Sequence, residues 1–143
     1  MLGYLLLGGR AGLLNRKGMY WSFENFRGPD YVLISAGGNF TDTDFAEMLE
    51  ELYRLDYWRP LIPLLLDERE LDISPVPTEQ LAKAVEYFLE QNPRLAYTRI
   101  AVVLGSEGAM QVAERFGNAV GSQTKAVVEA FLDRKEAENW LLV

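Results

Sequence analysis

Two runs of almost uniformly apolar residues constrain the fold of this chain most strongly. LIPLLLD occupies residues 61–67 and RIAVVLG occupies residues 99–105. A strand that is buried on both faces of a sheet has this composition, whereas a strand with one wet face alternates apolar and polar residues. The two runs therefore predict central strands of a sheet with helices packed on it. Pro63 fits near the beginning of the first strand, because proline donates no ladder hydrogen bond.

Amphipathic segments follow these runs and predict helices. In residues 41–55 the apolar residues recur at three- and four-residue steps, after a capping pair formed by Thr41 and Asp44. Three further helices are expected: one up to residue 92 with Pro93 as its stop signal, one after Ser106, and one in DRKEAENWLLV (residues 133–143), where Asp133 and Glu136 form a further capping pair.

The remaining strands complete an α/β arrangement. Residues 20–26 alternate aromatic and polar side chains, and residues 31–38 form a second strand after the turn RGPD, so the two predict an antiparallel hairpin. A last strand is expected at residues 124–131. The order is β-β-α-β-α-β-α-β-α, which predicts a mixed sheet with right-handed crossovers and helices packed on it.

Residues 1–18, MLGYLLLGGRAGLLNRKG, precede the regular pattern and predict an N-terminal extension to a single domain at residues 19–143. The longest uncharged apolar run there is far below the roughly 18–20 residues that span a membrane. The basic residues follow the apolar stretch, which is the reverse of a secretory signal. We therefore expect no membrane span and a cytoplasmic protein.

Composition excludes several kinds of chemistry. The 143 residues include no cysteine and no histidine, and the net charge is −7. Disulfides, thiolate zinc sites, cysteine nucleophiles, Ser-His-Asp triads and histidine zinc motifs are all excluded. A metal site would need carboxylates and a hard cation, and we expect neither a metal nor a cofactor. The negative charge repels phosphate backbones and argues against nucleic-acid binding.

The stretch LLLDERELDISP, residues 64–75, contains the first candidate site residue. The leucines predict a strand that ends at Asp67, and the charges after it a solvated connection. Because sites gather at the carboxyl ends of strands in α/β sheets, Asp67 is a candidate for ligand or anion binding or for a receiver-like phosphoacceptor. The structural alternative is that Asp67 accepts hydrogen bonds from loop N–H groups or pairs with Arg69.

Two serines are further candidates. Ser106 follows the next strand, so it either binds an anion together with backbone N–H groups or caps a helix. Ser74, together with Asp72 and Thr78 beside it, is a candidate for phosphorylation or partner contact, with a cap or turn as the alternative for Ser74. Either Ser74 or Thr78 is expected to cap the helix that follows.

Seven aromatic residues form a cluster in the first strand and at the end of the first helix. They are Tyr20, Trp21, Phe23, Phe26, Tyr53, Tyr57 and Trp58. Because a strand alternates, one set of rings should face away from the helices. Such a face marks a dimer or partner contact, a groove for an apolar ligand, or a surface covered by residues 1–18. These three interpretations stay open.

The segments LLLDERELD, RIAVVLGSEGAMQVAERF and VVEAFLDRKEAENWL, in this order, resemble the bacterial SpoIIAA-like (STAS) families, and in particular the branch grouped with CRAL-TRIO lipid-binding domains. The resemblance covers residues 20–143 and implies a SpoIIAA-like fold. It also implies a phosphorylatable serine at Ser74. Here Asp72-Ile73-Ser74-Pro75 departs from the family's Asp-Ser-Ser-Gly pattern, since the second serine and the glycine are missing.

The function expected from these observations is a non-catalytic, STAS-like regulatory or protein-interaction module of the anti-sigma-factor-antagonist type. No nucleophile and base converge in the sequence, so no catalytic residue is assigned. A protein partner and a homodimer are the expected contacts. The first alternative is a carrier of a small apolar or lipid-like ligand, bound between helices and sheet. The second is the receiver-like phosphoacceptor at Asp67.

Overall fold

The computed structural model describes residues 18–26, 30–73 and 76–143. Its elements are β1 (Met19–Phe26), β2 (Tyr31–Asn39), α3 (Asp42–Tyr53), β3 (Leu64–Asp72), α4 (Thr78–Glu90), α5 (Asn92–Leu95), β4 (Arg99–Leu104), α6 (Glu107–Gly121), β5 (Val127–Phe131) and α7 (Arg134–Leu141). The predicted order is confirmed, with the short helix α5 as an addition. Residues 1–17 and the turn residues 27–29 lie outside the described part of the chain.

The strands form one mixed sheet in the order β1-β2-β3-β4-β5. β1 and β2 form the predicted antiparallel hairpin, which runs from Met19 opposite Gly38 to Phe26 opposite Tyr31. The neighbours from β2 to β5 are parallel. The carboxyl ends of these parallel strands therefore meet at one edge of the sheet.

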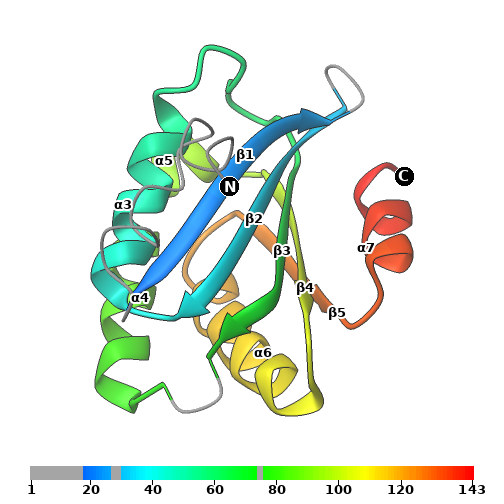
Figure 1. Cartoon of the computed structure of the whole chain (residues 1–143). Coiled ribbons are helices and arrows are strands. Elements are labelled where there is room, and N and C mark those ends of the chain that lie inside the picture. Colours follow the sequence, from blue (N-terminus) through cyan, green and yellow to red (C-terminus); the bar gives the residue numbers. More distant parts are fainter. Residues whose placement is uncertain (1–17, 27–29, 74–75) are drawn as a thin grey trace.

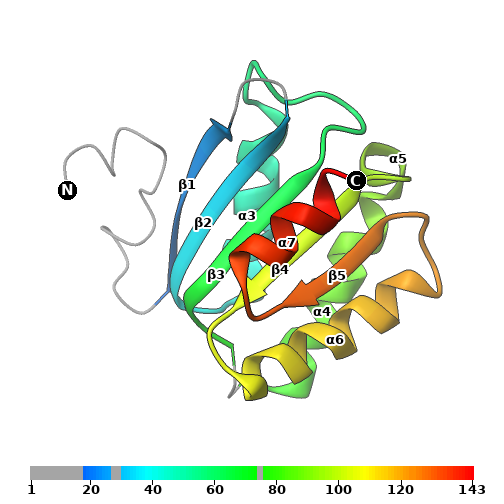
Figure 2. The same cartoon turned by 90° about the vertical axis from the view of Figure 1, so that its right-hand side faces the viewer.

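Helices cover both faces of the sheet, as the apolar runs predict. Figures 1 and 2 show α3, α4 and α6 on one face and α7 on the other. The larger core, under the three helices, includes Trp21, Ile34 and Met48, and the smaller core, under α7, includes Leu65 and Ala137. In the described ranges, none of the helices has the length and hydropathy needed to cross a membrane.

The central strand β3 differs from its prediction at both ends. Leu61 does not belong to it, because this residue has a left-handed backbone (φ 74°) and a side chain that is 61% exposed. The strand begins at Leu64 and continues to Asp72, so the charged residues after Asp67 extend the strand and do not form a loop. Pairing with β2 and β4 outweighs the polarity of this segment, because a central strand needs partners for its backbone groups.

A β-bulge interrupts the pairing of β2 with β3. Ser35 lies opposite Asp67 but Gly37 lies opposite Glu70, so β3 has one residue more than β2 in this interval. Leu64 and Leu66 face the larger core before the bulge, and Leu71 and Ile73 face it after the bulge. A bulge of this kind re-aims side chains and occurs often next to functional sites.

The helix caps follow the sequence prediction in three of four cases. Thr41, Ser106 and Asp133 each accept a hydrogen bond from the backbone N–H three residues later. The exception is α4: its N-cap is Pro77, and Thr78 is the first helical residue. The extended backbone of Pro77 (φ −62°, ψ 147°) fits an N-cap position, so Thr78 is not the cap.

Pro93 does not directly follow the end of helix α4. α4 stops at Glu90, and Pro93 is the second residue of the short helix α5. Proline is tolerated in the first turn of a helix, because the N–H that it lacks would have no partner within the helix. The predicted stop signal is thus the opening of another turn.

The predicted second face of aromatic rings is not found in the described part of β1. Trp21 and Phe23 point into the larger core together with Met19, because they are two residues apart. On the other face Tyr20 lies over Gly37, where a Cβ would come within 2.3 Å of its hydroxyl oxygen. Among the described side chains of β1, Tyr20 is therefore the one aromatic ring that faces away from α3, α4 and α6. The side chain of Phe26 lies outside the described residues.

Candidate functional site

A cavity lies between the sheet and the helices α3, α4 and α6. Its volume is about 80 Å³, counted as room for the centres of water-sized molecules. Its walls are Phe40, Phe45, Leu49, Leu64, Leu66, Glu68, Ile73, Val76, Leu81, Phe88, Leu95, Ile100, Val102, Val112, Ala113, Phe116 and Val128. All of these residues except Glu68 are apolar. Small-molecule sites are usually lined by apolar side chains with a few polar groups among them.

Aromatic rings join the three helices around this cavity. The Phe116 ring on α6 makes edge-to-face contacts with Phe45 on α3 and with Phe88 on α4, at centroid distances of 5.8 and 5.5 Å. Edge-to-face pairs are favourable beyond the area that they bury. The rings therefore hold the three helices together around the cavity wall.

Glu68 enters the cavity because of its place in β3. It lies two residues after Leu66 and four after Leu64, so strand alternation aims it at the same face as these leucines. Its side chain is buried, with 8% of the residue exposed. Glu68 pairs with Leu104, the last residue of β4. Glu68 thus lies beside the carboxyl end of β4, and ligands bind near the carboxyl ends of strands in open α/β sheets.

The Glu68 carboxyl group has no partner among the residues that the structure describes: no hydrogen bond or ion pair there involves it. Burial raises the pKa of Glu68 from the ordinary 4.5 to about 7, and the negative charge of Asp67 adds to the rise. A buried acid without a counter-charge is costly to ionise. Such groups are frequent at functional sites.

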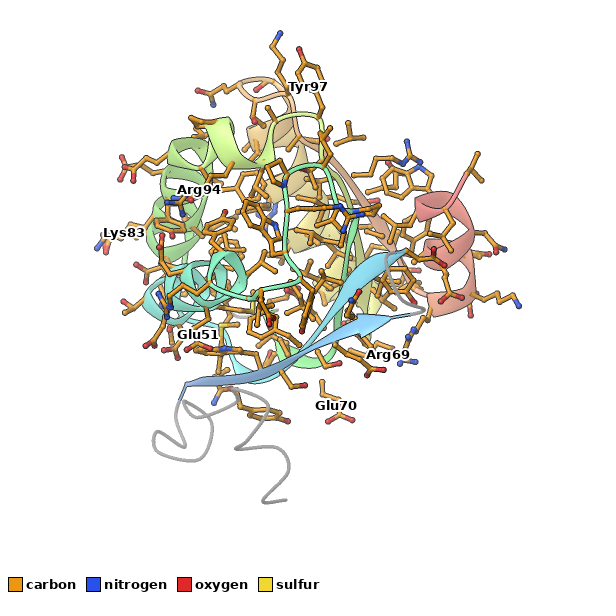
Figure 3. All side chains as sticks on the ribbon, turned by 90° about the horizontal axis from the view of Figure 1, so that it is seen from above. Glu51, Arg69, Glu70, Lys83, Arg94 and Tyr97 are labelled. Atoms are coloured by element: carbon orange, nitrogen blue, oxygen red, sulfur yellow. The ribbon has the colours of Figure 1, made fainter. Side chains whose placement is uncertain are left out.

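Asp67 lies on the opposite face of β3, toward α7. The Arg69 guanidinium donates to both of its carboxylate oxygens, at 2.9 and 2.7 Å. Burial opposes the ionisation of Asp67, but the hydrogen bonds from Arg69 outweigh it and hold the pKa of Asp67 below its ordinary value. Figure 3 shows Arg69 on the side of the molecule that carries α7. The predicted pairing with Arg69 is confirmed, while the predicted strand end at Asp67 is wrong.

A solved structure resembles this arrangement. It is an uncharacterised protein of the DUF3478 family from Shewanella loihica PV-4, described as having a SpoIIAA-like fold. The two share 19% sequence identity with a TM-score of 0.53, over 87% of this chain and 94% of the other. This chain has a SpoIIAA-like fold. The resemblance expected from the sequence is thereby confirmed for the fold, and at this identity it carries no statement about function.

Comparison by sequence adds no further relative. No family model matches the chain. No curated protein matches it either.

The segment from Asp72 to Thr78, which contains Ser74, is described only at its two ends. Ser74 and Pro75 lie outside the described residues, so the phosphorylation or partner-contact role of Ser74 stays a prediction. Asp72 is the exposed last residue of β3, and its carbonyl oxygen accepts a hydrogen bond from the backbone N–H of Phe40 at 3.2 Å. Thr78 is exposed at the start of α4. Neither Asp72 nor Thr78 lines the cavity.

Ser106 is a helix cap in this fold. Its Oγ accepts a hydrogen bond from the backbone N–H of Ala109 at 3.1 Å. Replacing Ser106 by alanine should therefore lower the free energy of unfolding by about 1 kcal/mol, and replacement by aspartate should preserve most of it, because aspartate also caps. Urea denaturation of the two variants measures this difference. Equal stability of Ser106→Ala and the parent would contradict the capping role.

Glu68 is the residue that the sequence analysis misses. The charges in DERELD (residues 67–72) predict a solvated connection, and such a connection would have no alternation of side chains between the two faces of a sheet. A signal was present: if the strand that begins with the leucines continues, Glu68 falls on the same face as Leu64 and Leu66. What the sequence does not reveal is the bulge that follows, which returns Leu71 to that face.

Proposed function

We propose that this SpoIIAA-like domain is a non-catalytic binding module and that it holds a small apolar molecule in the cavity around Glu68. The observation that carries the proposal is one buried, unpartnered carboxyl group, among the described residues, in a cavity whose other walls are apolar. This is the carrier role that the sequence leaves as the first alternative to a protein-contact module.

The cost of Glu68 to the fold supports this proposal. An apolar residue would match Leu66, Val102 and Val112 on the same cavity wall, whereas the Glu68 carboxylate gives up most of its hydration without a partner among the described residues. Residues that break a packing rule in this way are frequent at functional sites, where stability is lower than the fold would allow. A bound molecule that meets the carboxyl group would compensate for the lost hydration.

The lining of the cavity supports binding without catalysis. Among the wall residues that the structure describes, Glu68 is the one ionisable group, and none of the others carries a hydroxyl, amide or basic side chain. Acid–base or nucleophilic chemistry needs at least a second polar group within hydrogen-bond reach of the reacting atoms. These walls provide apolar contact and one carboxyl group, which suffices to orient a ligand.

The protein-contact module expected from the sequence is the second candidate. It is supported by the SpoIIAA-like fold, in which β3 ends at Asp72 and α4 begins at Thr78. Its central residue, Ser74, is outside the described residues. The regulatory role, the protein partner, the homodimer and the phosphoacceptor at Asp67 remain predictions.

Filling the cavity should abolish ligand binding. Ala113 lines the cavity from α6, so Ala113→Phe places a ring in the space that a ligand would occupy. We expect toluene and hexan-1-ol to shift the methyl NMR signals of Leu64, Val102 and Val112 saturably in the parent protein. In Ala113→Phe the affinity should fall at least about tenfold, since the apolar contacts with the wall are lost.

The matched control is Ala119→Phe, the same change on the same helix at a residue that does not line the cavity. Its methyl shifts and its affinity for both probes should equal those of the parent. Circular dichroism and thermal unfolding of both variants establish that they are folded. The proposal is overturned if neither probe gives a saturable shift in the parent, or if both variants bind as the parent does.

A further inference from the structure

The charges around Glu68 indicate which head group a ligand of this cavity would carry. Within the described part of the cavity wall, Glu68 is the one charged side chain. Its neighbours Asp67 and Arg69 form an ion pair with each other on the opposite face of β3. No cation among the described residues therefore compensates the Glu68 carboxylate.

A carboxylate accepts hydrogen bonds and donates none. An anionic ligand, such as a fatty acid, would place a second negative charge beside Glu68, in a medium that screens charge poorly. An alcohol would donate one hydrogen bond and leave the charge uncompensated. An ammonium group would donate charge-assisted hydrogen bonds and neutralise the carboxylate as well. The net charge of −7 also favours the approach of cations.

The size of the cavity limits the apolar part of the ligand. One water needs about 10–15 Å³ on this measure. The volume of about 80 Å³ therefore corresponds to roughly five to eight atoms of that size. A short alkyl chain or a single ring fits this space, whereas a full-length lipid tail would extend beyond it.

We propose that the cavity recognises small apolar amines: the ammonium group binds the Glu68 carboxylate, and the chain or ring packs against the wall formed by Leu66, Val102, Val112 and Phe116. This inference rests on the proposed function, because it assigns the head group of the molecule that the cavity would hold. It makes Glu68 the residue that determines specificity, and the apolar wall the source of general affinity.

Three probes of equal chain length test the head group: hexylamine, hexan-1-ol and hexanoate. They are titrated at pH 8 into the full chain, and methyl chemical shifts are followed. Hexylamine should bind at least about tenfold more tightly than hexanoate, with hexan-1-ol between them, since hydrogen bonds to charged groups are the strong ones. In Glu68→Gln the affinity for hexylamine should fall about tenfold, while that for hexan-1-ol stays within about twofold.

Glu70→Gln is the matched control, because it removes one negative charge from an exposed residue of the same strand. It should leave the order of the three probes unchanged. If hexan-1-ol binds but hexylamine has no advantage, or keeps its advantage in Glu68→Gln, the amine inference is wrong and the binding module stands. If no probe gives a saturable shift, the proposed function itself fails.

Discussion

Glu68→Gln should be more stable than the parent protein by about 3 kcal/mol at pH 8 and nearly equal to it at pH 4. The pKa of Glu68 lies at about 7 in the folded chain against an ordinary value of 4.5. Each pKa unit corresponds to about 1.4 kcal/mol, which gives the expected difference. Urea denaturation across pH 4 to 9 measures it.

The direction of this effect follows from proton binding. Between pH 4.5 and 7 the unfolded chain releases the Glu68 proton while the folded chain retains it, so the folded state binds more protons in this window. Stability attributable to this residue therefore falls as the pH rises from 4.5 to 7, and stays low above it. Glutamine has no proton to lose, so the difference between variant and parent should grow through the same window.

Glu70→Gln tests whether a change in stability comes from the buried position of Glu68 or from the loss of any one negative charge. Glu70 is exposed two residues after Glu68, and its replacement should change the free energy of unfolding by less than about 0.5 kcal/mol at any of these pH values. A Glu68→Gln variant that is no more stable than the parent at pH 8 would show that the carboxyl group is hydrated or paired. That result would remove the main support for a ligand site.

Trp21→Ala should lower the free energy of unfolding by about 3–5 kcal/mol, the range for deletion of a large core side chain. Trp21 has no exposed surface and lies in the larger core. Its indole N–H donates to Glu51 Oε1 at 2.9 Å, which ties the edge strand β1 to α3. Figure 3 shows Glu51, a residue of α3, on the side of this helix near β1. Equilibrium unfolding in urea, followed by circular dichroism, measures the loss.

Trp21→Phe distinguishes the two contributions of this residue. It keeps an aromatic ring in the core but loses the N–H donor, so we expect a loss of about 1–2 kcal/mol. A loss in Trp21→Ala below about 1 kcal/mol would mean that β1 does not depend on its contact with α3. That outcome would contradict the burial of this strand against the helices.

The proposed ligand and the stability of the domain are linked. A molecule that binds only the folded state stabilises it according to its concentration and affinity. The cavity combines a destabilising carboxyl group with aromatic contacts that already hold α3, α4 and α6 together. The fold therefore does not require the ligand, while an amine would recover part of the stability that Glu68 costs.

Local patterns in the sequence determined the elements of this fold. The runs at residues 61–67 and 99–105 are apolar on both faces, and β3 and β4 are the strands on which helices pack from both sides. Thr41, Ser106 and Asp133 cap helices as expected, because a cap depends on residues only three positions apart. Such local signals suffice for the element order, whereas the SpoIIAA-like fold is what the family resemblance implies.

Tertiary structure alone decided the site. The C-terminal boundary of β3 depends on the pairing of Asp72 with Asn39, which is far away in the sequence, and this pairing draws a charged segment into the sheet. The pairing of β3 points the Asp67 side chain toward Arg69 and α7. It points the Glu68 side chain into the cavity between the sheet and three helices. Local composition predicts that Asp67 ends a strand and that Glu68 is a solvated acid. Their different environments arise because neighbours in a strand face opposite sides, and the long-range packing determines what lies on each side.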